Sequence, residues 1–182
     1  QVVMKALPLL AIQLLAITII LQAPSVVASG PGHKHGAELI KEIKKKFPNT
    51  DHAVIISKRR DIMHALGDSM KRIAKGLKQE VSITDLNEAA IKIEEIGRII
   101  PSLFPPGTGM ETYNGVTGAK SAIFSDASGF KTLSLKMSSL ASDFIEAANT
   151  GASTTVLRSK FRLIGRQTCG GCHRIYREKL RH

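Results

Sequence analysis

Hydrophobic residues recur at intervals of three and four along most of the chain, and this spacing predicts amphipathic helices with almost no strand. The first two predicted helices cover residues 50–76 and 84–100. A loop over 101–118 follows, with three prolines and four glycines, and two further helices are predicted over 119–150 and 153–180. Four amphipathic helices with mostly short connections predict an all-α fold, an antiparallel up-down four-helix bundle.

The first and last predicted helices show which residues should face the bundle interior. Their apolar positions alternate between steps of three and four, which is the spacing of a bundle seam. The stripe of the first helix is Ile56, Arg59, Met63, Leu66, Met70, Ile73 and Leu77. The stripe of the last helix is Leu157, Phe161, Ile164, Cys169, Cys172, Tyr176 and Leu180.

The N-terminal segment has the features of an export signal. Met4 and Lys5 precede an apolar run over residues 6–21, and Pro24 ends that run. The run is shorter than the ~20 apolar residues that span a bilayer. Small residues before Ser29 offer a cleavage site, so we favour cleavage near Ala28 over an uncleaved anchor.

Three parts are therefore expected along the chain. Residues 1–28 form a signal peptide, and residues 29–50 form a glycine-rich tether with a short basic helix over 37–47. Residues 51–182 form one four-helix-bundle domain, which is long enough for a real core. Export predicts a periplasmic location, with no stable membrane insertion after signal removal.

The charge balance narrows the class of partner. The chain has 26 basic and 15 acidic residues, a net charge of +11, which favours acidic partners. Few aromatics, no nucleic-acid-binding motif and an export signal argue against nucleic acid. Residues 158–182 hold eight Lys or Arg and a single acid, Glu178. This segment is either a docking surface for an acidic redox partner or an ordinary solvated helix face.

Cys169, Cys172 and His173 carry the most specific chemistry in the sequence. They spell Cys-Gly-Gly-Cys-His, the pattern for covalent attachment of one c-type haem. On a helical turn the three side chains share one face, so two thiols can form thioethers while the imidazole approaches the iron. The alternatives are a redox disulfide with an incidental histidine, or a zinc site that lacks a second ligand pair.

A haem on the last helix needs neighbours from the first helix. Iron ligands in proteins are drawn from His, Met, Cys and Tyr. Met63 lies early on the first helix and so faces the late CxxCH segment; its alternative role is core packing. Arg59 is either a partner of a haem propionate or a snorkelling residue at the bundle end. Tyr176 either touches the haem edge or packs in the core.

Four segments resemble one known family, the class II cytochromes c or cytochrome c-prime superfamily. They are 55–70 (IISKRRDIMHALGDSM), 103–109 (LFPPGTG), 122–130 (AIFSDASGF) and 164–177 (IGRQTCGGCHRIYR). They occur in the family's order, and the CxxCH close to the C-terminus is its hallmark. The resemblance covers about residues 51–180.

The resemblance implies roles for individual residues. Cys169 and Cys172 would carry the haem, His173 would be the proximal ligand, Met63 falls at the distal position and Arg59 matches an arginine near a propionate. Two departures concern packing and proximal polarity: Phe124 stands where many members have tryptophan, and Gly170 replaces a commonly basic residue. Residues 29–49 have no counterpart.

These observations predict a periplasmic one-electron carrier with His173 and Met63 as axial ligands, of the low-spin type, and not an enzyme. A His/Met pair fills both axial positions of the iron. The rival is a five-coordinate cytochrome c-prime that binds nitric oxide or carbon monoxide. Expected partners are acidic redox proteins, and the resemblance also implies a homodimer through the first two helices.

Overall fold

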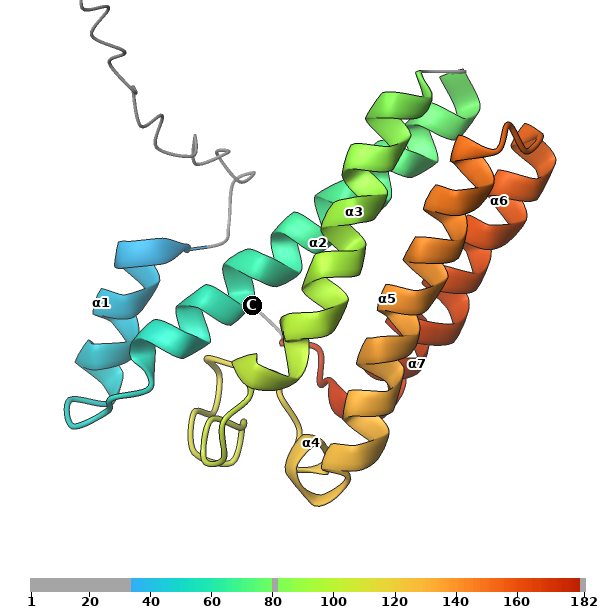
Figure 1. Cartoon of the computed structure of the whole chain (residues 1–182). Helices are drawn as coiled ribbons and strands as arrows, with labels where there is room; N and C mark the ends of the chain where they lie inside the picture. Colours follow the sequence, from blue (N-terminus) through green and yellow to red (C-terminus); the bar gives the residue numbers. More distant parts are fainter. Residues whose placement is uncertain (1–33, 80–81, 181–182) are drawn as a thin grey trace, which may run out of the picture. The chain divides into compact units, whose positions relative to one another are not determined.

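The computed structural model describes residues 34–79 and 82–180 of the 182-residue chain (Figure 1). The expected signal peptide (1–28) and the first part of the expected tether lie outside these residues. Within the described ranges the elements are helical, with one isolated bridge between Ala119 and Arg177. In chain order they are α1 (Gly36–Lys46), α2 (Ala53–Gln79), α3 (Ile83–Ile99), the 3-10 turn η1 (Ile100–Leu103), α4 (Ala122–Ser125), α5 (Ala127–Asn149), α6 (Thr154–Leu163), the π-helical turn η2 (Ile164–Cys169) and α7 (Gly170–Tyr176).

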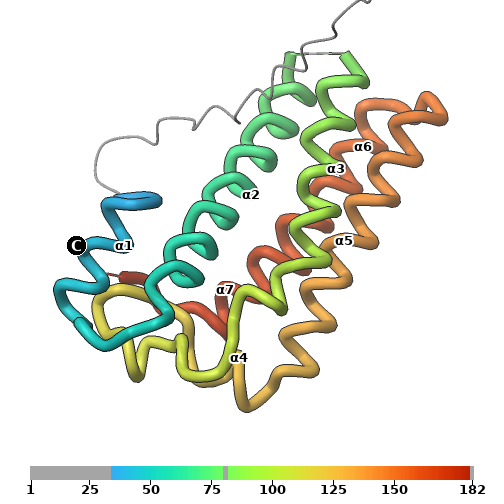
Figure 2. Tube along the Cα trace, turned by 60° about the vertical axis from the view of Figure 1, so that its left-hand side comes forward, coloured from blue at the N-terminus to red at the C-terminus, as the bar shows by residue number. Residues whose placement is uncertain are grey.

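The predicted four-helix bundle is confirmed. Its members are α2, α3, α5 and the continuous run of α6, η2 and α7. Helix α3 packs against both α2 and α5, and α6 packs against α5 and α2 (Figures 1 and 2). Their inward side chains form one apolar cluster, called the bundle core here, whose fully buried members include Ile73, Ile93, Phe144 and Ile164.

Small residues bring α3 and α5 close together. A Cβ atom on Gly97 would lie 2.8 Å from the backbone nitrogen of Ser138 and 3.1 Å from the carbonyl oxygen of Ser134. The Ser134 hydroxyl donates to the Gly97 carbonyl at 2.5 Å. Glycine at this position therefore sets the distance between the two helices.

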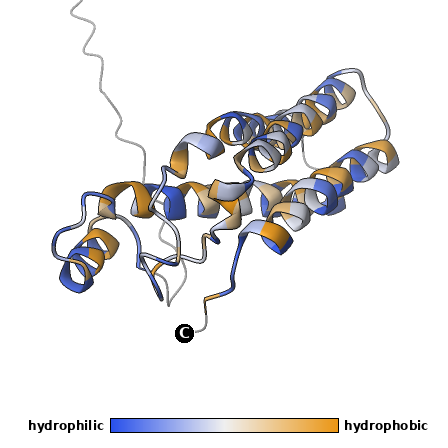
Figure 3. Ribbon diagram, turned by 90° about the horizontal axis from the view of Figure 1, so that it is seen from below, coloured by the Kyte–Doolittle hydropathy of each residue, from blue (hydrophilic) through white to orange (hydrophobic). Residues whose placement is uncertain are grey.

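A second apolar cluster, called the N-terminal core here, lies between α1, the start of α2 and the long loop. Leu39 and Ile43 of α1 are buried in it, together with Ile56 of α2 and Tyr113 and Val116 of the loop. Helix α1 lies where the sequence predicted a short basic helix, with three lysines in its last turn. Each helix alternates hydrophobic and hydrophilic residues around its axis (Figure 3), as such packing requires.

Among the helix starts that differ from the prediction, two are set by side-chain caps. The helix expected from residue 119 begins at Ala127, because Asp126 leaves the helical conformation (φ −122°, ψ 51°) and its carboxylate accepts from the Gly129 N–H at 3.0 Å. The helix expected to start at Thr84 starts at Ile83, and its cap is Ser82, whose hydroxyl accepts from the Asp85 N–H. Both are N-caps by side-chain oxygens.

The last helix ends earlier than predicted, at Tyr176 instead of residue 180. Beyond it the backbone pairs with the long loop: the Lys120 N–H donates to the Tyr176 carbonyl at 3.0 Å, and the Glu178 N–H donates to the Gly118 carbonyl at 2.7 Å. These bonds hold the end of α7 to the loop. Among the helices described, none is both long and apolar enough to cross a bilayer.

Candidate functional site

The Cys-Gly-Gly-Cys-His segment lies at the junction of η2 and α7. Cys169 ends the π turn, and Cys172 and His173 lie on α7. Both cysteines are free thiols, half-buried, and packed against the bundle core. His173 is exposed, and Arg177 donates to its Nδ1 atom at 3.4 Å. The predicted attachment residues are therefore all on one short helical segment beside the core.

The electrostatics of the two thiols argue against a redox disulfide. Burial raises the pKa of Cys169, although the Thr168 hydroxyl acts in the opposite direction. Burial and then the neighbouring Cys169 raise the pKa of Cys172 to about 11. A redox-active CxxC pair needs a thiolate near neutral pH and hence a lowered pKa. The zinc alternative also lacks support, because no group of three or more His, Cys, Asp or Glu in the described ranges is arranged to hold a metal.

Half-buried apolar side chains on three elements lie at the edge of the same bundle core. Met63 and Met70 of α2, Leu133 of α5 and Phe161 of α6 all pack against the bundle core without being fully enclosed. A Cβ atom on Gly171 would lie 3.7 Å from Leu133. Helix α2 packs against α6, and toward α7 the last helix lies farther from α2 (Figure 1).

This set of residues fits a planar apolar group bound through two sulfur atoms. Two protonated thiols three residues apart are available for thioether bonds, and a histidine directly follows the second. The apolar side chains supply the surface against which such a group would be buried. The donor set is therefore that of a c-type haem.

Arg59 is buried, with 5 % of its surface exposed, and this excludes the snorkelling interpretation. Its guanidinium donates to the Thr108 hydroxyl at 3.1 Å, to the Thr108 carbonyl at 2.9 Å and to the Thr117 hydroxyl at 2.9 Å. It also lies over the Phe104 ring, 4.4 Å from its centroid. Burial and then the charge of Arg60 lower the pKa of Arg59 to about 10. No carboxylate within the described residues pairs with it, and the propionate partner stays a prediction.

Tyr176 is 3 % exposed, and its surroundings are those of a core residue. Its hydroxyl donates to Asp126 at 2.5 Å, and its ring meets Phe130 edge to face at 5.1 Å. Burial and then the hydrogen bond with Asp126 raise the pKa of Tyr176 to about 12. Contact between Tyr176 and a haem edge stays a prediction.

Sequence reasoning missed the loop residues that hold Arg59. Thr108 and Thr117 are buried although their loop has no periodic pattern. Only the unexplained arginine on an apolar stripe pointed to such partners. Their oxygen atoms fix the guanidinium one helical turn before Met63.

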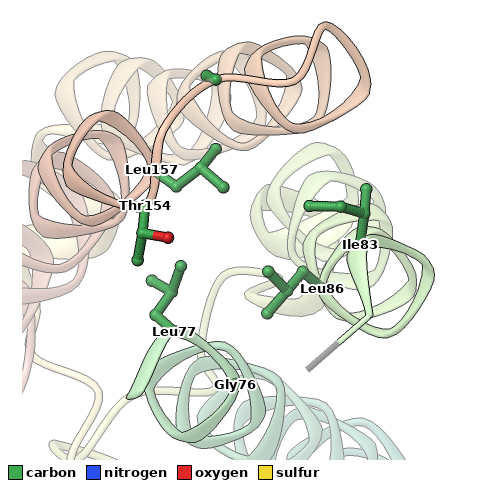
Figure 4. A pocket seen from close by; sticks show the side chains of 7 residues that line it. Gly76, Leu77, Ile83, Leu86, Thr154 and Leu157 are labelled. Atoms are coloured by element: carbon green, nitrogen blue, oxygen red, sulfur yellow. The ribbon is translucent and has the colours of Figure 1, made fainter. Parts of the chain in front are cut away.

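A separate hollow of about 180 Å³ lies at the other end of the last helix (Figure 4). It is lined by Gly76, Leu77, Ile83, Leu86, Ala152, Thr154 and Leu157. Leu157 precedes Cys172 by four helical turns, so this hollow does not belong to the cysteine site.

Comparison with known proteins identifies the family. The family model described as Cytochrome C' matches residues 54–177. A curated relative, cytochrome c' of Pararhodospirillum photometricum, is 32 % identical over 125 residues, which are 66 % of this chain and 93 % of the relative. Helix α1 lies outside the segment that the family model matches.

Solved structures show the same fold. Cytochrome c' of Thermochromatium tepidum has a TM-score of 0.63 at 23 % identity, covering 72 % of this chain and 99 % of that one. A cytochrome c' with ligand-controlled dimer dissociation has a TM-score of 0.62 at 24 % identity and covers 72 % and 99 %. A ferrous variant of the Alcaligenes xylosoxidans protein, with bound NO, has a TM-score of 0.60 at 20 % identity and covers 70 % and 96 %.

These findings correct the expectation of a low-spin electron carrier with His173 and Met63 as axial ligands. The matched family is cytochrome c', which is typically high-spin and five-coordinate. Methionine at the distal position is then an apolar side chain of the kind that fills irregular space, and the rival interpretation of the sequence is the supported one. The chain belongs to the cytochrome c' family, whose members carry one covalent c-type haem with its iron.

Proposed function

We propose that this protein is a periplasmic haem protein that binds nitric oxide or carbon monoxide and is not an enzyme. The observation that carries the proposal is the pair of half-buried cysteines, Cys169 and Cys172, against the core of a cytochrome c' bundle, with His173 directly after them. A ferrous haem with one protein ligand supplies an open coordination position for such diatomic ligands. The NO-bound relative supports this choice of ligand.

Each residue has a defined part in this proposal. Cys169 and Cys172 form the two thioether bonds, and His173 is the proximal ligand. Met63 lies on the opposite, α2 side and keeps that side apolar, which disfavours water and charged ligands. Arg59 keeps a positive charge within one helical turn of Met63 and so favours a propionate there. Tyr176 packs behind α7.

The absorption spectrum of the purified protein tests the proposal. We expect a high-spin ferric spectrum and a large Soret change when carbon monoxide is added to the ferrous form. Met63→Ala should leave the spin state unchanged, and Met63→Leu is the control for side-chain volume. A low-spin ferric spectrum with a sulfur-to-iron charge-transfer band, lost in Met63→Ala, would overturn the proposal.

Covalent attachment is tested separately by mass spectrometry of the denatured chain. The polypeptide should carry the mass of one haem, and Cys169→Ala with Cys172→Ala should abolish it. Two unmodified thiols in the native protein would contradict the role of these cysteines.

An acidic redox protein is the partner that keeps the haem ferrous in this proposal. Arg162, Arg166, Arg174 and Arg177 are exposed, and none of them forms an ion pair within the described ranges. Exposed arginines that form no ion pair attract carboxylate-rich surfaces. Association should therefore weaken with salt, and Arg162→Glu with Arg166→Glu should slow reduction by an anionic reagent such as Fe(II)-EDTA.

Homodimer formation is part of the same proposal. Cytochrome c' structures include a dimer whose dissociation is controlled by ligand. Sedimentation of the holoprotein with and without carbon monoxide tests this, and a monomer at all concentrations would contradict it.

A further inference from the structure

The last helix changes its winding immediately before the cysteines. In η2 the Gly170 N–H donates to the Gly165 carbonyl, five residues earlier, where an α-helix would use a step of four. The Thr168 hydroxyl donates to the Ile164 carbonyl at 2.6 Å, and Thr168 is 1 % exposed. The turn therefore contains one residue more than an α-helix of the same length.

Burial on either side of η2 shows what the additional residue does. An α-helix advances about 100° per residue, so Ile175, 18 residues after Leu157, would point to the same side as Leu157. Tyr176 would then lie about 100° away. The structure shows the reverse: Leu157 and Tyr176 are each 3 % exposed, whereas Ile175 is 43 % exposed. The helix after η2 is thus rotated by one residue relative to the helix before it.

The same rotation acts on the attachment residues. In an unbroken α-helix Cys169 would lie about 120° from the direction of Leu157, and His173 about 160° from it. One additional residue reduces these angles to about 20° and 60°. Cys169 and Cys172 pack against the bundle core in the structure, as the reduced angles require.

We propose that η2 is the device that turns Cys169 and Cys172 toward the bundle, and that Thr168 is the positioning residue that holds it. The hydroxyl of Thr168 supplies the Ile164 carbonyl with a hydrogen bond inside the widened turn, where the regular α-helical pairing is lost. This inference rests on the proposed haem attachment at Cys169 and Cys172. Under this proposal, the turn before the CxxCH motif aligns the motif with the bundle. The motif alone does not set this alignment.

Deletion of the exposed Gln167 tests the register, because it removes the additional residue. We expect at least a tenfold loss of covalent haem per polypeptide, measured by mass spectrometry of the denatured holoprotein preparation. Gln167→Ala keeps the chain length and should retain full haem content. A variant that combines deletion of Gln167 with insertion of one alanine between Ile164 and Gly165 has the original number of residues in the turn. It should regain covalent haem.

A second readout does not depend on haem. Tyr176 should resist nitration by tetranitromethane in the native chain and become reactive in the deletion variant, while buried Tyr113 serves as an internal reference. Full haem content together with a protected Tyr176 in the deletion variant would overturn the proposal. A native chain without haem would overturn the proposed function, whereas the nitration pattern would still test the register.

Thr168 is tested by two substitutions that keep the chain length. Thr168→Val removes the hydroxyl at nearly constant shape and should lower haem content or shift the ferrous CO spectrum, and Thr168→Ser should rescue both. Thr168→Val with native haem content and an unchanged CO spectrum would remove Thr168 from the proposal. If the deletion variant does not fold, the nitration of Tyr176 in Thr168→Val is the remaining test of the register.

Discussion

The bundle core and the N-terminal core of this protein are built on different principles. The bundle core joins long helices through regularly spaced apolar side chains, and it holds the cysteine segment. The N-terminal core joins the 11-residue α1 to the start of α2 and to two loop residues, Tyr113 and Val116. The family match begins at residue 54, so α1 is an addition to the shared bundle.

Side-chain hydrogen bonds to backbone carbonyls support the N-terminal core. Arg60 donates to the Val116 carbonyl at 2.7 Å, Lys46 to the Asn114 carbonyl at 2.7 Å, and Ser57 to the Gly36 carbonyl at 3.1 Å. A helix of 11 residues is marginal by itself in water, so α1 depends on these links and on its buried Leu39 and Ile43. We infer that the bundle unfolds as a unit, whereas α1 can open locally.

The largest expected effect comes from breaking the bundle core at Phe144. Its side chain is fully buried, so Phe144→Ala should lower the free energy of unfolding by about 4 kcal/mol. Urea unfolding followed by circular dichroism measures this, with the exposed Leu135→Ala as control, expected within about 0.5 kcal/mol of the native protein. A loss below about 1 kcal/mol at Phe144 would show that the core collapses around the substitution.

The crossing of α3 and α5 gives the next effect. Gly97→Ala places a Cβ atom against the backbone of Ser138 and Ser134, so the helices must separate. We expect a loss of about 3 kcal/mol, although alanine is the better helix former. Gly67→Ala is the matched control, since nothing lies within 4 Å of its Cβ position; it should stabilise by up to about 1 kcal/mol. Equal effects of the two substitutions would contradict the close approach.

The sequence predicts the bundle core well because helical period and burial coincide there. Leu66, Ile73 and Leu77 are buried as their spacing predicts. The N-terminal core was not predicted, since Tyr113 and Val116 lie in a loop without period. Their burial depends on contacts with α1 and α2 that no local pattern encodes.

The features of the site also differ in how well the sequence predicts them. The CxxCH motif identifies Cys169, Cys172 and His173 because their chemistry requires fixed spacing. The π turn was visible only as a step of five residues from Ile164 to Cys169 in the apolar stripe. Ligation by Met63 was predicted wrongly, because a methionine on an inward face has the same pattern whether it binds iron or packs.

The N-terminal core is broken selectively by Ile43→Ala. Ile43 is fully buried, and its truncation should cost about 2 to 3 kcal/mol in the docking of α1. Hydrogen exchange over residues 36–46 should accelerate by roughly a factor of 100, while the amides of α5 and the Soret spectrum keep their native values. The exposed Lys44→Ala is the control. Equal acceleration in α5 would show that the two cores unfold together.

The smallest expected effect concerns the hydrogen bond between Tyr176 and Asp126 at the edge of the bundle core. The pKa of Tyr176 is raised from 10 to about 12 in the folded protein, so the folded chain retains a proton that the unfolded chain loses. This contribution to stability is complete below pH 10 and is lost as the pH rises toward 12. Tyr176→Phe should cost about 1 kcal/mol at neutral pH and flatten the decline between pH 10 and 12, measured by urea unfolding across that range. An unchanged decline in stability between pH 10 and 12 would show that other titrating groups cause it. Because Ile43→Ala leaves Tyr176 in place, this variant should keep the native dependence of stability on pH. The two cores therefore differ in whether their disruption changes the loss of stability at high pH.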